Sequence, residues 1–193
     1  MGSSPVFTPA CAAEPSFDCS KARKGAEGIV CTDDELAALD QKLSEVYATA
    51  LKMYKESALE SEVKLLKAEQ RGWIKGRDEC WKAQNERDCV EFDYRSRIAE
   101  LQAGFGLAPS NGPVFYVCDG NPANEVVATF FETNPPTARL ERGDSQVIAY
   151  LTPSGSGAKY EGRNVTFWSK GKEAAVTWGW NTEEMRCLER QAR

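Results

Sequence analysis

One stretch decides the fold of the second half of the chain, and it reads Ala158-Lys159-Tyr160-Glu161-Gly162-Arg163-Asn164-Val165-Thr166-Phe167-Trp168-Ser169-Lys170-Gly171-Lys172-Glu173-Ala174-Ala175-Val176-Thr177-Trp178. Apolar and polar residues alternate in three short runs, Ala158–Glu161, Val165–Trp168 and Ala174–Trp178. Glycines separate the runs, as is typical of tight turns. Alternation with a period of two indicates half-buried strands, so this stretch predicts three consecutive antiparallel β-strands.

Runs of the same kind continue on both sides of this stretch. They are Val114–Cys118, Val126–Phe131, Thr137–Leu140, Gln146–Leu151 and Met185–Leu188. Turn residues lie between them, for example Asp119-Gly120-Asn121-Pro122 and Asn134-Pro135-Pro136. Eight short strands joined by tight turns predict an eight-stranded antiparallel β-barrel.

The first half of the chain has the 3.6-residue period of helices instead. Thr32 and Glu35 form a capping box that predicts one helix start, and Ser57 with Glu60 predicts a second. A third helix is expected after the polar turn around Asn85. The residues expected to face inward are Leu36, Leu39, Leu43, Val46, Tyr47, Ala50 and Tyr54, then Leu59, Val63, Leu66, Trp73, Ile74 and Trp81, then Val90, Tyr94, Ile98 and Leu101. The first half is therefore predicted to be a small antiparallel helical bundle.

The period changes at a stretch rich in glycine and proline, Gly104–Pro113, which reads as a linker. The expected architecture is a multidomain α and β protein. Residues 14–104 form its helical domain and residues 113–193 form its barrel domain.

The cysteines indicate an oxidising compartment. Seven in 193 residues is a high number, and none forms a Cys-x-x-Cys pair, so we expect neither a zinc nor a redox site. Cys118 and Cys187 lie in the first and last predicted strands, where a disulfide would join the two ends of the sheet. For the other four we favour Cys19 with Cys31 and Cys80 with Cys89, although four cysteines allow three connectivities.

Cys11 is the odd cysteine. Met1-Gly2-Ser3-Ser4 resembles an expression scar, and Pro9-Ala10-Cys11-Ala12-Ala13 resembles the small-residue end of a secretion signal. Cys11 is a candidate lipid-attachment site, but Thr8-Pro9-Ala10 before it is a poor lipoprotein signal, so we favour an unpaired remnant. Membrane anchoring is expected only if Cys11 carries a lipid.

Composition excludes several classes of function. The chain has no histidine, which removes histidine-based general bases, Ser-His-Asp triads and histidine metal ligands. The net charge of −5 argues against nucleic acid as a partner, because phosphate binding requires a basic face. No apolar run approaches the roughly 18 residues that a membrane helix needs. We expect no cofactor and no catalytic residue.

The second half resembles the family of membrane-bound inhibitors of c-type lysozyme (MliC). The matching features occur in the family's order, and they are Phe115-Tyr116-Val117-Cys118, Ser154-Gly155-Ser156-Gly157-Ala158-Lys159-Tyr160, Phe167-Trp168-Ser169-Lys170-Gly171-Lys172-Glu173-Ala174 and Cys187. The combination is specific, whereas each piece alone would be weak.

The first half resembles the LprI family, which is also linked with lysozyme inhibition. The features are Cys19, Cys31, Leu36-Ala37-Ala38-Leu39-Asp40, Tyr47, Gln70-Arg71-Gly72-Trp73-Ile74, Arg77-Asp78-Glu79-Cys80, Cys89 and Tyr94-Arg95-Ser96-Arg97-Ile98. Together the two resemblances imply a lysozyme inhibitor of the bacterial periplasm or cell envelope, whose partner is a c-type lysozyme.

The MliC resemblance also implies a binding site. Ser156 would hydrogen-bond the catalytic carboxyl groups of the lysozyme, and Lys170 would pair with one of them. Gly155 and Gly157 flank Ser156 and let its backbone approach a partner closely. Lys172 is the alternative to Lys170 as the cation. Tyr160 either contacts the partner or packs in the barrel, and packing with partial exposure is favoured.

Several alternatives stay open at this point. Trp168, Trp178 and Trp180 fit core or rim positions better than a sugar-binding platform. Trp73, Arg77 and Asp78 are either a tryptophan core residue with an ion pair or a partner-binding face. The chain as a whole could instead be a cell-envelope module that binds peptidoglycan or a small ligand. A carboxylate-based glycosidase is a third hypothesis, but no motif points to a pair of acids.

Overall fold

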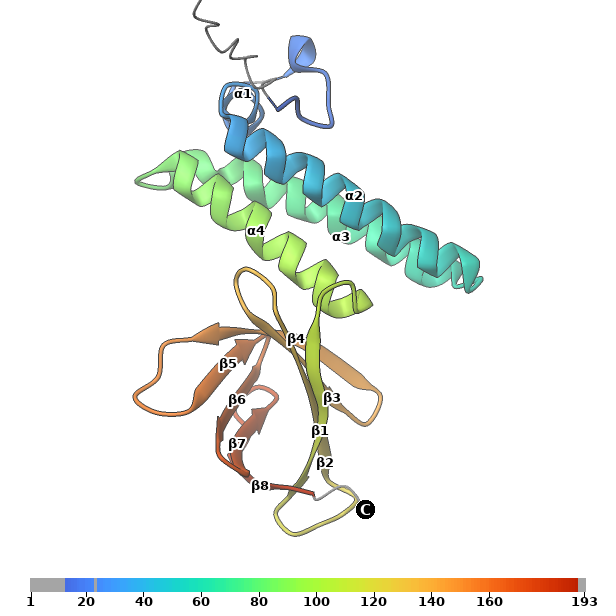
Figure 1. The fold of residues 1–193 in the computed structure, drawn as a ribbon, viewed down its shortest axis with the longest axis vertical. Coiled ribbons are helices and arrows are strands. Elements are labelled where there is room, and N and C mark those ends of the chain that lie inside the picture. The colour runs from blue at the N-terminus through green and yellow to red at the C-terminus, as the bar shows by residue number, and fades with distance from the viewer. Residues whose placement is uncertain (1–12, 23, 191–193) are drawn as a thin grey trace, which may run out of the picture. The chain divides into compact units, whose positions relative to one another are not determined.

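A computed structural model of the chain describes residues 13–22 and 24–190. Cys11 and the segments around it that resemble a scar and a secretion signal therefore lie outside the described residues, apart from Ala13. The chain divides into two compact units, Met1–Tyr94 and Arg95–Arg193. The first unit is helical and the second contains a β-barrel, as the ribbon in Figure 1 shows. The predicted fold class is confirmed.

The helical part contains the three predicted helices together with shorter elements. In chain order the elements are the 3-10 turn η1 (Cys19–Lys21), α1 (Ala26–Val30), α2 (Asp34–Glu56), α3 (Glu60–Asp78), the 3-10 turn η2 (Glu79–Lys82) and α4 (Glu86–Phe105). The helices α2 and α3 lie side by side as an antiparallel hairpin (Figure 1). The short helix α1 was not predicted, because so few residues show no period. The division between the two units falls within α4.

Both predicted capping boxes are wrong in detail. The N-cap of α2 is Asp33, whose carboxylate accepts from the amides of Glu35 and Leu36 at 3.0 and 3.1 Å. The Thr32 hydroxyl instead donates to carbonyls of the preceding helix. Ser57 ends α2 and does not cap α3, which begins after Leu59 without a side-chain cap. A carboxylate one residue later outcompetes the Thr32 hydroxyl, because its charge favours the helix N-terminus.

The buried face of α3 also differs from the prediction. Leu66 and Arg77 are its buried residues, and Trp73 is half-buried on the same face. Three residues that were expected to face inward, Leu59, Ile74 and Trp81, are 44%, 37% and 63% exposed. Arg77 is buried on this helix instead, with its guanidinium held by Tyr94 and Asp78. The inward-facing residues predicted for α4, among them Val90 and Tyr94, are buried.

All eight predicted strands are present and form a closed antiparallel barrel in sequential order. They are β1 (Ser110–Cys118), β2 (Glu125–Phe131), β3 (Thr137–Arg142), β4 (Ser145–Thr152), β5 (Ala158–Gly162), β6 (Val165–Lys170), β7 (Glu173–Trp178) and β8 (Met185–Glu189). One boundary is earlier than predicted. Ser110 and Asn111, assigned to the linker, pair with Phe131 and Phe130 in β2, so they belong to β1.

Inward-facing side chains from every strand fill the barrel, as expected for eight strands. Phe167 lies at the centre of this core, with its ring 5.3 Å from that of Tyr116 and 6.1 Å from that of Phe130. Closure occurs where β1 pairs with β8, and Cys118 lies opposite Cys187 in that register. A disulfide joins the same two residues. The ends of the sheet are thus joined by backbone hydrogen bonds and by a covalent bond.

The other two disulfides join Cys19 to Cys31 and Cys80 to Cys89, which are the pairs favoured from the sequence. The first holds η1 against the end of α1. The second closes the turn between η2 and α4. Among the described residues, none of the helices has the length and apolar character needed to cross a membrane.

Candidate functional site

The loop Ser154–Gly157 joins β4 to β5 and is held in a defined shape. The Ser154 hydroxyl lies 3.3 Å from the carbonyl oxygen of Ser156 and 3.1 Å from that of Gly157. Gly157 has φ +69°, and a Cβ there would overlap the carbonyl oxygen of Ser169. Only glycine fits this close approach. The Ser156 side chain is exposed, and its hydroxyl has no hydrogen-bond partner among the described residues.

Strand β6 presents Lys170 on the outside of the barrel. Its burial alternates, with Val165 and Phe167 inward and Trp168 and Lys170 exposed. This follows from the two-residue period of a strand. Lys170 is also the last residue of β6, and Gly171 with φ +61° turns the chain into β7. The lysine is therefore carried on a short hairpin between two paired strands.

The structure brings Ser156 and Lys170 together at one surface cleft of about 640 Å³. The loop and the hairpin approach each other because Ala158 at the start of β5 pairs with Ser169 near the end of β6. The cleft is lined by Ser156, Trp168, Lys170, Glu173, Ala174, Ala175, Asp119, Gly120, Glu184, Arg186, Cys187 and Leu188. A hydroxyl donor and a cation thus face the same open space, although they are separated in sequence by a whole strand.

The charges around this cleft leave Lys170 available. Glu173 is its cross-strand neighbour, but no ion pair joins Lys170 to any residue in the described ranges. Asp119 is engaged, because its carboxylate accepts from the backbone amide of Arg186 at 3.0 Å. An exposed ammonium group without a partner can bind an acid on another molecule without first breaking an internal pair.

The remaining predicted site residues lie in different places. Gly155 and Gly157 belong to the loop beside Ser156. Lys172 is exposed on the same hairpin as Lys170, but it does not line the cleft. Tyr160 is 8% exposed, and its ring lies 5.4 Å from that of Phe130 inside the barrel. Burial raises the pKa of its hydroxyl. The structure thus places Tyr160 in the core.

Sequence reasoning missed the walls of the cleft. Trp168 is 41% exposed, and its indole Nε1 donates to the carbonyl oxygen of Ser156 at 2.7 Å. Leu188 and Arg186 come from β8, and Asp119 comes from the turn after β1. The alternation of β6 could have placed Trp168 beside Lys170. Nothing local could have added the residues of β8, because they reach the cleft through the pairing of β8 with β7 and with β1.

In the helical unit, Arg77 is the centre of a buried polar network. Its Nη1 donates to the hydroxyl of Tyr94 at 2.8 Å, and that hydroxyl donates to Asp40 at 2.9 Å. Its Nη2 donates to Asp78 at 2.7 Å, and the guanidinium lies 5.5 Å from the ring centroid of Trp73. Burial raises the pKa of Tyr94, so the hydroxyl keeps its proton. Arg77 is only 4% exposed and belongs to the core of the helical unit, whereas Trp73 is half-buried and Asp78 is exposed.

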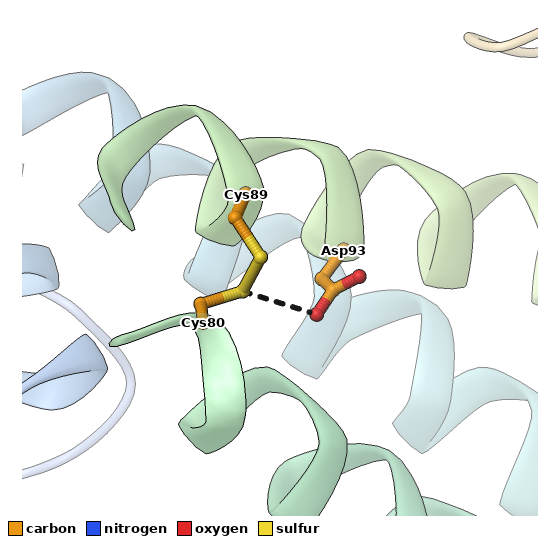
Figure 2. A group of neighbouring side chains, drawn as sticks. All are labelled: Cys80, Cys89 and Asp93. Atoms are coloured by element: carbon orange, nitrogen blue, oxygen red, sulfur yellow. Dashed lines mark hydrogen bonds between the residues drawn. A yellow bond between two sulfur atoms is a disulfide. The ribbon is translucent and has the colours of Figure 1, made fainter. Parts of the chain in front are cut away.

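Cys80, Cys89 and Asp93 form a second close cluster in the helical unit, drawn in Figure 2. Their potential ligand atoms lie within 4.8 Å of one another. The two sulfur atoms are joined in a disulfide, however, so neither can serve as a thiolate ligand. Burial raises the pKa of Asp93, and its Oδ2 lies 3.5 Å from Sγ of Cys80. The cluster is a disulfide packed against a carboxyl group.

Fold and site together define a class of protein. The described strands form a closed barrel whose interior is filled by side chains, and the candidate site is an exposed cleft on its outer surface. The site pairs an unengaged hydroxyl with an unengaged ammonium group. The molecule is thus a small disulfide-bonded protein whose closed antiparallel barrel carries a polar cleft on its surface.

Comparison with known proteins identifies the family. Residues 116–185 match the family model described as "Membrane-bound lysozyme-inhibitor of c-type lysozyme", and residues 19–103 match the one described as "Lysozyme inhibitor LprI". Lipoprotein LprI of Mycobacterium tuberculosis is 30% identical over 172 residues, which cover 89% of this chain and 84% of the relative. Lipoprotein LprI of Mycobacterium bovis gives the same values. The chain belongs to the LprI family of lysozyme inhibitors, with an MliC barrel as its second half, and it is not an enzyme.

Proposed function

We propose that this protein inhibits a c-type lysozyme by inserting the barrel surface around Ser156 and Lys170 into the active-site cleft of the enzyme. One observation carries the proposal. Two side chains from separate turns line the same exposed cleft, and neither is engaged by another described residue. Family membership supports a c-type lysozyme as the partner. The geometry of the cleft supports Ser156 and Lys170 as the residues that bind it.

The chemistry of the target fits this pair. A c-type lysozyme cleaves a glycosidic bond with two carboxyl groups, one a general acid and the other an ionised partner. The Ser156 hydroxyl can donate to one carboxyl group, and the Lys170 ammonium can pair with the ionised one. Hydrogen bonds between charged groups are about twice as strong as those between neutral groups. Lys170 is therefore expected to contribute more to binding than Ser156.

Titration of the purified chain against a c-type lysozyme acting on cell walls tests the function. We expect lysis to fall to zero near equimolar inhibitor, and undiminished lysis at large excess would refute the function. Lys170→Ala should raise the inhibition constant about 30-fold and Ser156→Ala about tenfold, since hydrogen bonds to charged groups contribute about 1.5–3 kcal/mol. Lys172→Ala is the matched control on the same hairpin and should change little. Equal losses for both lysine variants would refute the assignment to Lys170.

We further propose that residues 113–193 form the inhibitory domain and residues 14–104 a separate domain. The family matches at 116–185 and 19–103 support this division. The full-length Ser156→Ala/Lys170→Ala variant tests it. An inhibition constant raised by about the product of the two single effects, roughly 300-fold, assigns the activity to the barrel, whereas a much smaller rise assigns part of it to the helical domain.

We also propose a location in the bacterial cell envelope, because the relatives are named lipoproteins and one family is described as membrane-bound. Sedimentation with purified cell wall separates inhibition from the alternative, a module that binds peptidoglycan. An inhibitor that acts only on the enzyme should stay in the supernatant, whereas cosedimentation without lysozyme would favour the alternative.

A further inference from the structure

Trp168 is an exposed aromatic residue whose side chain makes a hydrogen bond within the protein. Its side chain is 41% exposed, although burial of a tryptophan ring is strongly favourable. Its Nε1 donates to the carbonyl oxygen of Ser156 at 2.7 Å, across a separation of twelve residues. The ring thus links β6 to the loop that carries Ser156.

The loop has two other restraints, and both act on its backbone close to Gly157. The Ser154 hydroxyl lies against the carbonyls of Ser156 and Gly157. Gly157 packs against the backbone of Ser169. The indole of Trp168 differs from both, because it is a side chain of strand β6 and it binds the Ser156 carbonyl directly. It is also two residues from Lys170 on the same outer face of β6.

Trp168 therefore contacts Ser156 through a hydrogen bond and lies on the same strand as Lys170. A loop that is ordered before binding does not lose its conformational freedom on binding, which increases affinity. Trp180 offers the contrast, since it is 84% exposed and makes no hydrogen bond to the described residues of the loop.

We propose that Trp168 is a positioning residue, which holds Ser156 in register with Lys170 before the partner arrives. The inference rests on the proposed function of this cleft. It predicts that Trp168 acts on binding through Ser156 and not mainly through its own contact with the partner.

The variant Trp168→Phe removes the indole donor and keeps most of the aromatic surface. We expect the inhibition constant to rise about fivefold, while the free energy of unfolding falls by no more than about 1 kcal/mol, the net contribution of one hydrogen bond. Trp180→Phe is the matched control and should leave the inhibition constant unchanged. An unchanged inhibition constant for Trp168→Phe would overturn the proposal.

A double-mutant cycle separates positioning from direct contact. Ser156→Ala keeps the backbone carbonyl, so the indole hydrogen bond survives in that background. If Trp168 acts through the Ser156 hydroxyl, Trp168→Phe should have less than a twofold effect there. Independent, multiplied effects of the two substitutions would overturn the positioning role and indicate that the ring contacts the partner directly.

A measurement without lysozyme keeps this inference distinct from the proposed function. Amide relaxation by NMR should show lower order parameters at Ser156 and Gly157 in Trp168→Phe than in the wild type. The Trp180→Phe variant should match the wild type. Unchanged order in the loop would overturn the positioning role even if inhibition is confirmed. Failure of the wild type to inhibit would refute the proposed function and leave the loop measurement to decide this inference.

Discussion

The helical unit and the barrel bury their interiors in different ways. The barrel core is an apolar cluster, and the buried polar residues on its described strands and turns are threonines. The core of the helical unit contains Asp40 and Arg77, connected through the hydroxyl of Tyr94. The excess of acidic over basic residues that gives the net charge of −5 lies in residues 1–94, whereas the two kinds balance in 95–193.

This difference concerns what defines the packing of each unit. A closed sheet needs no polar network to define its register, because strand pairing and alternation already do so. Its turns are then free to carry Ser156 and Lys170. The helical unit has a buried polar network in its core, and in some proteins buried polar groups select one packing among several. The two units should therefore respond differently to the same kinds of change.

The largest expected difference concerns the disulfides. Cys118–Cys187 spans 69 residues, and Cys80–Cys89 spans nine. The chain-entropy model gives about 4 kcal/mol for the longer loop and about 3 kcal/mol for the shorter one. Double substitution to serine should thus destabilise the barrel more than the helical unit. Urea unfolding, with hydrogen exchange to locate the affected unit, measures both, and a larger loss for Cys80→Ser/Cys89→Ser would contradict the comparison.

The next effect tests the polar core directly. Tyr94→Phe removes the hydroxyl between Arg77 and Asp40, and the free energy of unfolding should fall by about 2 kcal/mol. Tyr116→Phe is the matched change in the barrel, where the hydroxyl has no hydrogen bond to a described residue. Its effect should be close to zero. Equal losses, measured by urea unfolding, would show that the two cores do not differ in this respect.

A smaller effect concerns pH in the helical unit. The hydrogen bond from Arg87 lowers the pKa of Asp33 below its ordinary value of 3.8. The folded state therefore binds this proton less readily than the unfolded state. The resulting stability is fully present above about pH 5, and it is lost as the pH falls through the lowered folded-state pKa.

Asp33→Asn isolates this contribution, since asparagine also caps helices. The wild type should be more stable than this variant by up to about 1 kcal/mol at pH 7, given the partial exposure of the pair. That difference should shrink toward zero near pH 2. Urea unfolding at several pH values measures it, and a difference that persists in acid would show that the charge of Asp33 is not its source.

The smallest effect is a gain in stability. Ala58, between α2 and α3, has φ 55°, a conformation that costs most residues energy but costs glycine none. Ala58→Gly should raise the free energy of unfolding by about 0.5 kcal/mol. Asn164 in the barrel has φ 56°, and asparagine adopts this conformation more readily, so Asn164→Gly should gain less. Thermal unfolding of both variants compares them, and an equal gain would contradict this reasoning.

Much of the fold could be predicted from the sequence because its signals are local. Each of the eight strands was recognised by alternation over a few residues, and each turn by its own glycine, proline or asparagine. The three disulfide pairs are those favoured from the sequence, although the four cysteines of the first half allow three connectivities. Ser156 and Lys170 were selected through the family resemblance, and the structure then placed both at one cleft.

The sequence predictions were wrong where a residue had to be assigned to the buried or the exposed face of an element. Ile74 and Trp81 were expected in the core by their hydrophobicity, but Arg77 occupies it, because its charge is satisfied by Tyr94 and Asp78. A pattern of apolar residues cannot show that a charged residue has buried partners on other helices. The start of β1 at Ser110 was missed for a similar reason, since its pairing with β2 is not local.

The sequence by itself therefore determined the three long helices and the eight strands, their order and the absence of histidine chemistry, and it favoured the disulfide pairs that the structure has. The tertiary structure alone decided which side chains meet. Ser156 approaches Lys170 because β5 pairs with β6 in a particular register, and Trp168 reaches the Ser156 carbonyl in that same register. Periodicity is a property of neighbours along the chain, whereas a binding surface is made by hydrogen bonds between strands that the chain alone does not align.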